Sequence, residues 1–323
     1  MKNILLLHTG GTIAMKEDKE SGAVGQVGNH PLNEALSSLS EYGNIMTEDV
    51  FNLPSPHITS KEMLILKNRI EKAANNDNIE GVVITHGTDT LEETAYFLDL
   101  TIQSTIPVVL TGAMRSSNEV GSDGPYNLLS SIKVAASDDA VGKGVLVVLN
   151  DEIHTAKNVT KTHTSNVATF QSPQYGPVGI VTKRGVSFHH APIHRENFVI
   201  TNVSKKVMLL KAYAGMDSTL LTTLLDMDID GVVIEALGQG NLPPAMINGI
   251  TALLKQNIPV VLVSRCFNGI VQDIYGYEGG GRQLKDLGCI FSNGLSGQKA
   301  RIKLMIALEQ TVDFKELQEA FLN

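Results

Sequence analysis

Short apolar runs recur along the chain, and each is followed by a polar or glycine-rich turn and then by a helical pattern. In the first half the runs cover residues 3–9, 81–85, 107–111 and 144–149, and the helical patterns cover 32–40, 61–74, 91–101 and 126–137. The runs are continuously apolar rather than alternating, which is typical of strands covered on both faces. This alternation predicts an α/β fold with a mostly parallel sheet flanked by helices.

The same pattern restarts after a polar stretch at residues 187–203. Strands are predicted at 207–212, 231–235 and 259–264, and helices at 217–226, 244–256 and 298–311. These elements predict a second, smaller α/β unit with its own parallel sheet. We therefore expect an N-terminal domain over residues 1–190, a linker over 191–206 and a C-terminal domain over 207–323.

Three polar clusters come directly after predicted strands of the first unit. HTGGT (8–12) follows the run 3–9, THGTDT (85–90) follows 81–85, and TGAMR (111–115) follows 107–111. Ligands of open parallel sheets bind beyond the carboxyl ends of the strands. The sequence therefore predicts one binding site at this edge, and leaves its chemistry open.

The first cluster combines glycines with a hydroxyl group. Gly10 and Gly11 let the backbone approach a ligand closely, and Thr12 places a hydroxyl just beyond them. Neither GxGxxG nor GxxxxGK(S/T) is present here, which argues against a phosphate-binding loop. A tight turn without a ligand fits this cluster at least as well.

The second cluster places a hydroxyl and a carboxylate side by side at Thr88 and Asp89. Thr90 is expected to cap the helix that follows, which leaves these two for a ligand. A threonine hydroxyl is a weak nucleophile unless a base assists it, and Lys161 is the candidate base because burial can lower a lysine pKa to about 7–8. A neighbouring Asp89 would oppose that shift, and on spacing alone a surface lysine is the favoured interpretation of Lys161.

Composition limits the classes of partner. The chain has 323 residues, of which 42% are hydrophobic and 19% charged, as in soluble globular proteins. Its net charge of −8 and the lack of a basic run argue against nucleic acid, and no apolar stretch reaches the roughly eighteen residues of a membrane span. The two cysteines, Cys266 and Cys289, suit a reducing cytosol, and the apolar run 4–7 is too short for a signal peptide. A cytoplasmic protein is expected.

Two further segments have alternative interpretations. His189, His190 and His194 lie in the predicted linker without acidic or cysteine partners at ligand spacing, so a metal site is not expected there. The sequence EGGG at 278–281 is interpreted as a mobile connection whose glycines take unusual backbone angles, in preference to an anion-binding loop.

With these motifs in view, the sequence resembles the bacterial L-asparaginase family along almost its whole length. The matching segments are HTGGTIA (8–14), ITHGTDTLEETA (84–95), PVVLTGAMR (107–115), SDGPYNL (122–128), NVTKTHTSNVATF (158–170), GQGNLPP (238–244) and QKARIKL (298–304). The resemblance implies hydrolysis of L-asparagine to L-aspartate and ammonia without metal or cofactor. It also implies a homotetramer built from two tight dimers.

The resemblance carries roles over to individual residues. It makes Thr12 the nucleophile that forms an acyl-enzyme, and it places Thr88, Asp89 and Lys161 in a second catalytic cluster. Asp89 would also bind the α-ammonium group of the substrate, and Ser55 its α-carboxylate. Backbone N–H groups near the two threonines would stabilise the oxyanion.

Three further positions belong to the expected substrate-binding set. Gly11 and Ala113 lie in the loops that carry the site, and Asn241 matches a residue that reaches it from the C-terminal domain of the neighbouring subunit. Isolated subunits are therefore expected to be inactive.

The sequence departs from the family pattern at two places. Residues 15–29 contain no tyrosine, whereas many members polarise the first threonine with a tyrosine from this loop. GIVQDIY (269–275) resembles relatives that supply it from a C-terminal loop, so Tyr275 is expected to take the role, with Tyr277 as the alternative. Pro56 stands where secreted members commonly have a substrate-contacting Gln. Asparagine is expected to be preferred, with glutaminase activity left open, since one methylene changes binding by only about 1–3 kcal/mol.

Two other functions remain as alternatives. One is the ammonia-producing subunit of a tRNA-dependent amidotransferase, which has a similar core with an added N-terminal domain; here the first strand is expected to start at residue 3. The other is a sensor that binds asparagine without hydrolysing it. Such a receptor would need Asp89, but not two positioned hydroxyls and a lysine.

Overall fold

A computed structural model describes residues 1–26 and 39–322, and the chain divides into two compact units, Met1–Asn197 and Phe198–Asn323. The division falls inside the segment 191–206. Its first residues are anchored to the first unit, because the Asn197 side chain donates a hydrogen bond to the Ile102 carbonyl oxygen. The helix expected over 32–40 lies outside the described residues for all but its last two positions.

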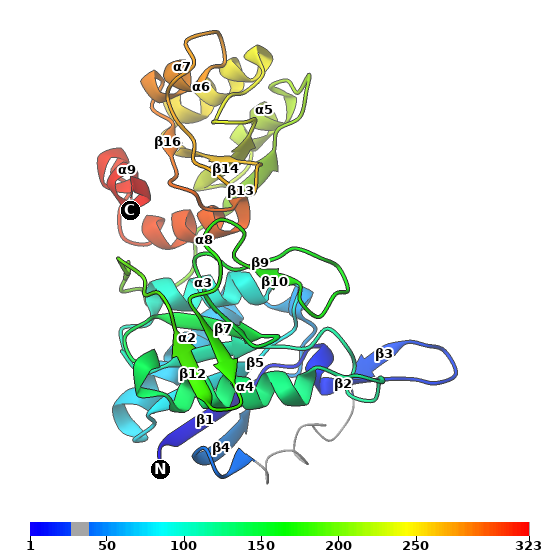
Figure 1. Cartoon of the computed structure of the whole chain (residues 1–323). Coiled ribbons are helices and arrows are strands. Elements are labelled where there is room, and N and C mark those ends of the chain that lie inside the picture. Colours follow the sequence, from blue (N-terminus) through cyan, green and yellow to red (C-terminus); the bar gives the residue numbers. More distant parts are fainter. Residues whose placement is uncertain (27–38, 323) are drawn as a thin grey trace. The chain divides into compact units, whose positions relative to one another are not determined.

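The first unit is built on an eight-stranded sheet with the order β12-β11-β8-β7-β6-β5-β1-β4 (Figure 1). Its parallel strands are β1 (Asn3–His8), β4 (Asn44–Asp49), β5 (Gly81–Thr85), β6 (Val108–Thr111) and β7 (Val145–Leu149). Antiparallel pairing then adds β8 (Glu152–Thr155), β11 (Gly179–Thr182) and β12 (Gly185–Phe188). The four strands predicted in this half are confirmed.

Helices cover both faces of this sheet. Alternate residues of the central strands, among them Ile4, Leu6 and Val83, pack with Leu128 and Ile132 of α4 (Gly124–Ala136) in one buried cluster. On the other face lies α3 (Leu91–Thr101), which contacts β6 and β7 and packs against α2 (Ser60–Asn76) (Figure 1). Because helices cover both faces, the central strands are apolar at consecutive positions rather than at alternate ones.

Short elements are also found in the described part of the first unit. They are η1 (Thr12–Ala14), η3 (Ser55–His57), η4 (Asp138–Ala140), the hairpin of β2 (Met15–Glu17) with β3 (Val24–Gln26), and the pair β9 (Thr160–Lys161) with β10 (Phe170–Gln171). Among the described residues, no helix is long and apolar enough to cross a lipid bilayer.

The second unit has a four-stranded parallel sheet with the order β13-β14-β15-β16. Its strands are β13 (Val207–Lys211), β14 (Gly231–Ala236), β15 (Val260–Ser264) and β16 (Ile290–Phe291). Its helices are α5 (Thr219–Leu225), η5 (Pro244–Met246), α6 (Ile247–Lys255), α7 (Gly281–Asp286), α8 (Gly297–Leu308) and α9 (Phe314–Leu322). The predicted α/β class is confirmed in both units.

The strand order places the candidate site. From β1 the chain proceeds to β4 on one side, and then to β5 on the other side of β1. The order therefore reverses between β1 and β5, and in open α/β sheets ligands bind at the carboxyl ends of strands at such a switch point. HTGGT follows β1 and THGTDT follows β5, so both clusters lie at this point.

Candidate active site

Glycines bring three loops of the first unit into backbone contact. Gly11 has φ +84° and ψ 179°, a conformation essentially restricted to glycine, and a Cβ there would lie 2.3 Å from the Gly87 Cα. A Cβ on Gly87 would in turn lie 2.7 Å from the Ser55 Cβ. The loops after β1 and β5 and the turn η3 thus meet at positions that tolerate no side chain.

The two threonines follow the glycines that touch. Thr12 is the first residue of η1 and is half-buried, and Thr88 is buried. Because Gly11 and Gly87 are in contact, the backbone segments that carry both hydroxyl groups adjoin each other.

Lys161 joins this group from a distant part of the chain. Its Nζ donates to Thr88 Oγ1 at 3.0 Å and to Asp89 Oδ1 at 2.7 Å. The Lys161 side chain is 16% exposed, whereas that of Asp89 is 61% exposed. The interpretation of Lys161 as a surface lysine is therefore wrong, because the β9 segment folds over the THGTDT loop and aims the amine at it.

Glu92 fixes the strand that carries this lysine. The Glu92 carboxylate is buried, and it accepts a hydrogen bond from Thr160 Oγ1 at 3.1 Å and one from the Lys161 backbone N–H at 3.3 Å. This role of Glu92 was not predicted from the sequence. The available signal was an acidic residue in the first turn of α3, which more often stabilises a helix end.

The expectation that the Thr90 hydroxyl caps α3 is wrong. Thr90 occupies the N-cap position, but its Oγ1 donates to the Ser55 carbonyl oxygen at 2.8 Å. The Ser55 hydroxyl is buried and accepts from the Asp89 N–H at 3.2 Å, so it retains its own hydrogen to donate. These bonds place the Ser55 hydroxyl beside the Asp89 backbone.

The buried His86 side chain connects the THGTDT loop to helix α3. Its Nδ1 lies 2.8 Å from the Gly87 carbonyl oxygen and its Nε2 lies 2.9 Å from Thr94 Oγ1. Complete burial lowers the pKa of His86 to about 4. The neutral ring therefore donates from Nδ1 to the carbonyl and accepts from the threonine at Nε2.

The third cluster, TGAMR, is held by the start of α4. The Asp123 carboxylate accepts the Met114 N–H at 3.0 Å and the Arg115 N–H at 3.0 Å, and Asn127 donates to the Gly112 carbonyl oxygen at 3.0 Å. Ala113 lies in this loop and is buried. Asp123 and Asn127 of the SDGPYNL motif thus fix the loop after β6.

The remaining expected site residues belong to the second unit. Tyr275 and Tyr277 are exposed, with ring centroids 5.5 Å apart. Asn241 Oδ1 accepts the Gly281 N–H at 3.1 Å. The first unit thus brings together Gly11, Ser55, Thr88, Asp89 and Lys161, with Thr12 on the adjoining segment. Tyr275, Tyr277 and Asn241 all belong to the second unit.

The interpretation of the EGGG glycines needs correction. Only Gly279 has a positive φ, at +81°. A Cβ on Gly280 would lie 2.3 Å from the Tyr275 carbonyl oxygen, and one on Gly281 would lie 2.4 Å from the Gln272 carbonyl oxygen. Close backbone packing, rather than unusual angles, requires two of the three glycines.

No group of three or more His, Cys, Asp or Glu side chains suited to a metal ion occurs in residues 1–26 and 39–322. Both cysteines are free thiols, with Cys266 exposed and Cys289 buried. The chemistry at the switch point consists of hydroxyl, ammonium and carboxylate groups.

The fold and the site define a two-unit α/β protein. At the switch point of its larger sheet, one lysine donates hydrogen bonds to a threonine and an aspartate. Residues 3–194 match the family model described as "Asparaginase, N-terminal", and residues 206–321 match the "Glutaminase/Asparaginase C-terminal domain". The chain therefore belongs to the asparaginase family.

Individual relatives agree with this assignment over nearly the full chain. A probable L-asparaginase of Deinococcus radiodurans is 40% identical, with 99% of this chain and 97% of the relative covered. L-asparaginase 2 of Bacillus subtilis is 37% identical, with 99% and 86% covered. The crystal structure of a probable cytoplasmic L-asparaginase from Campylobacter jejuni has a TM-score of 0.90 at 34% identity and covers all of both chains.

Proposed function

We propose that this chain hydrolyses the side-chain amide of L-asparagine to L-aspartate and ammonia. The observation that carries the proposal is Lys161 Nζ within hydrogen-bond distance of both Thr88 Oγ1 and Asp89 Oδ1, beside the loop that carries Thr12. The comparisons support neither the asparagine sensor nor the amidotransferase subunit.

The proposed reaction uses Thr12 as the nucleophile. Its oxygen forms a bond to the amide carbon, the carbon–nitrogen bond breaks, and the hydroxyl proton is transferred to the leaving nitrogen, which departs as ammonia. Water then hydrolyses the resulting ester, which yields aspartate and restores the hydroxyl. Backbone N–H groups of the adjoining Gly11 and Gly87 loops are the proposed donors to the oxyanion, an interaction worth about 3–4 kcal/mol in other hydrolases.

Thr88, Asp89 and Lys161 form the second group of the proposed site. Thr88 Oγ1 accepts from the ammonium and keeps its own hydrogen, so it can orient the hydrolytic water. The exposed Asp89 carboxylate is the proposed partner of the substrate α-ammonium, and the Ser55 hydroxyl is the proposed donor to its α-carboxylate. Ala113, held in the loop after β6, completes the pocket wall.

Besides binding the substrate ammonium, Asp89 is proposed to position Lys161. One carboxylate oxygen lies 2.7 Å from the Lys161 ammonium, and the side chain still has most of its surface open to solvent. A carboxylate has about four acceptor sites, so binding the substrate ammonium does not require Asp89 to release the lysine.

We also propose a shared active site within a homotetramer. Asn241 and Tyr275 would reach the site from C-terminal units, with Asn241 coming from a neighbouring subunit and Tyr275 (or else Tyr277) polarising Thr12. Support comes from the exposure of both tyrosines and from the hydrogen bond that orients Asn241 on its loop. A cytoplasmic location is proposed on the two free thiols and on the relative described as cytoplasmic.

Asparagine is the proposed preferred substrate. Glutamine adds one methylene, which corresponds to a discrimination of about 10- to 200-fold in a fitted pocket. Measurement of kcat/KM for both amides checks this. A ratio near unity would show that the pocket does not discriminate between side chains that differ by one methylene.

The function is tested by ammonia release from L-asparagine. Thr12→Val and Lys161→Met are each expected to lose at least a hundredfold in kcat, because a nucleophile and its supporting ammonium are removed. Thr101→Val is the matched control, since its hydroxyl donates within α3, to the Phe97 carbonyl oxygen, and full activity is expected. Wild-type protein that binds asparagine without releasing ammonia would refute the proposal.

A further inference from the structure

A cavity of about 220 Å³ lies in the first unit, away from the switch point. Its lining residues are Tyr42, Lys133, Ala136, Ser137, Lys183, Arg184, Gly185 and Val186. They come from the end of α4, the turn between β11 and β12, the start of β12, and the segment before β4. Three of the eight are cationic, in a chain whose net charge is −8.

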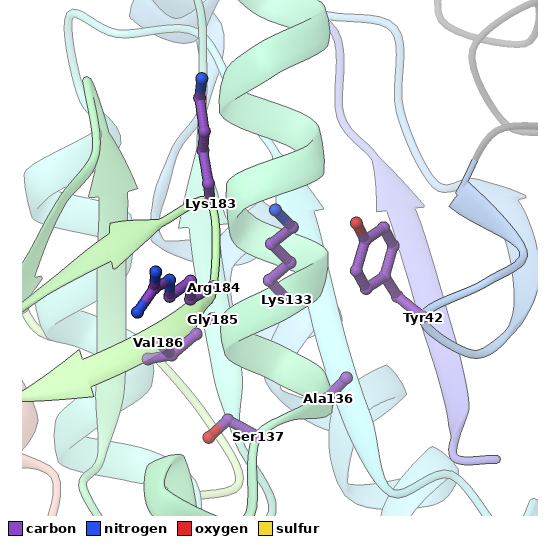
Figure 2. Close-up of a pocket in the computed structure, with 8 residues that line it drawn as sticks. All are labelled: Tyr42, Lys133, Ala136, Ser137, Lys183, Arg184, Gly185 and Val186. Carbon is purple, nitrogen blue, oxygen red and sulfur yellow. The ribbon is translucent and has the colours of Figure 1, made fainter.

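Figure 2 shows how these side chains are arranged. Lys133 extends from α4 between Tyr42 on one side and Arg184 on the other, and Ser137 lies at the helix end. The Lys133 ammonium lies 5.2 Å from the centroid of the Tyr42 ring, a contact that holds the cation without neutralising it. Lys183 and Arg184 form the two-residue turn of the hairpin.

The cations of the cavity lack close carboxylate partners. Within residues 1–26 and 39–322, no ion pair involves Lys133, Lys183 or Arg184. Two acidic residues flank the cavity: Asp138 is paired with Lys2 at 2.6 Å, and Glu41 is hydrogen-bonded to the Tyr42 hydroxyl. Counted over the described residues, three cations without an ion-pair partner stand against one rim carboxylate, which makes the cavity net positive.

The ligand class follows from charge and size. A guanidinium and two ammonium groups belong to the residues that line the cavity. Such a lining fits a compact oxyanion with two or more charges, since guanidinium matches the paired oxygens of phosphate. The cavity is smaller than the roughly 300–1,000 Å³ that enclose drug-sized ligands. It therefore suits a phosphate or diphosphate group, free or as part of a small molecule.

We propose that the cavity lined by Lys133, Ser137, Lys183 and Arg184 is a binding site for a phosphate-type anion, separate from the active site. Its separation follows from α4. The first residue of this helix, Gly124, packs against Ile13 and Ala113 of the active-site loops, whereas its last turn lines the cavity. Thirteen helical residues span about 20 Å, so the two sites lie at opposite ends of one helix.

The test is calorimetric titration of the full-length protein with inorganic phosphate and with pyrophosphate at constant ionic strength. Saturable binding of one anion per chain is expected for pyrophosphate, and weaker binding for phosphate. Lys133→Gln and Arg184→Gln should each lower the affinity at least tenfold. Lys72→Gln, which removes the same charge from an exposed position on α2, should change it less than twofold.

Several results would overturn the proposal. They are the absence of saturable binding up to about 10 mM, unchanged affinity in Arg184→Gln, and an equal loss in Lys72→Gln, which would indicate a nonspecific charge effect. Ammonia release by the variants serves as the check on folding, because none of these residues belongs to the proposed catalytic group. A variant without activity is replaced by Lys183→Gln, which changes only an exposed turn.

Discussion

At the scale of single residues, the site depends on one ammonium group shared between a hydroxyl and a carboxylate. Lys161 is a point donor on a flexible stem, and its reach to Thr88 and Asp89 is set by the backbone of β9. That backbone is fixed by the buried Glu92 carboxylate. A displacement of about 1 Å at this position would separate the amine from its partners, and such displacements cost up to about a hundredfold in rate.

Glu92 is accordingly predicted to be a positioning residue. Glu92→Ala should lower kcat about 10- to 100-fold with KM changed less than threefold, because Lys161 is misplaced while the substrate contacts remain. Glu92→Gln should recover most of kcat, since its amide oxygen can still accept both hydrogen bonds. Steady-state kinetics on the two variants decides this, and equal defects in both would assign the role to the charge instead.

His86 is predicted to make stability depend on pH. Its pKa is lowered from 6.5 to about 4 in the folded protein, so the unfolded chain binds more protons between these values. Stability from the neutral ring is complete above pH 6.5 and falls with pH, by about 3 kcal/mol in total. Asp99 acts in the opposite direction, since burial raises its pKa to about 6 and protonation stabilises the fold as pH falls.

The His86 contribution is therefore measured as a difference. Denaturant unfolding of wild type and His86→Gln at pH 7.5 and pH 5 should show the wild-type advantage shrinking by about 2 kcal/mol at the lower pH. Asp99 is present in both proteins, so its effect cancels. Parallel losses in the two proteins would mean that His86 does not titrate in this range.

At the scale of elements, the site is a consequence of glycine contacts between loops. Gly11 combines a backbone conformation that costs other residues about 1–3 kcal/mol with a contact that leaves no room for a Cβ. Gly22, in the β2–β3 hairpin, also has a positive φ, at +68°, but a Cβ there would meet nothing within 4 Å. Both positions have a positive φ, but only Gly11 also has a steric overlap.

Gly11→Ala is predicted to lose at least a hundredfold in kcat/KM, because the loop that carries Thr12 must move away from Gly87. Gly22→Ala, as the control, should stay within about threefold of wild type, because it also has a positive φ but a Cβ there meets no neighbouring atom of the described residues. Activity and melting temperature of both variants are the measurements. Near-normal kcat/KM in Gly11→Ala would show that the contact with Gly87 is dispensable.

Central elements were predictable because burial on two faces leaves a continuous apolar run, as in β1, β5 and β6. Edge strands were not, because most of their positions can face solvent; in β4 only Ile45 and Glu48 are partly buried, and the other positions are exposed. The loops that form the site followed from the parallel sheet. The placement of Lys161 did not, because it contacts Thr88 across 73 positions of sequence through tertiary packing alone.

The same limit applies to the anion cavity. Lys133 and the pair Lys183–Arg184 are fifty residues apart, so no basic run exists in the sequence, and only the packing of a hairpin beside α4 brings them together. Charge arguments from composition describe the whole surface and leave such local concentrations undetected.

At the scale of the whole molecule, the active sites are predicted to be shared between subunits. A mixture of Thr12→Val and Asn241→Ala subunits, unfolded together and refolded, should regain about a quarter of wild-type activity. In such mixing about half of the pairs are mixed, and each has one intact site. If activity stays at the level of the separate variants, each site is built from a single chain.

The identity of the acylated residue tests directly whether Thr12 is the nucleophile. Enzyme mixed with L-asparagine and quenched in acid within milliseconds should carry an aspartyl ester on the peptide that contains Thr12, and Thr12→Val should carry none. An ester on the Thr88 peptide, or ammonia release by Thr12→Val at the wild-type rate, would contradict the account.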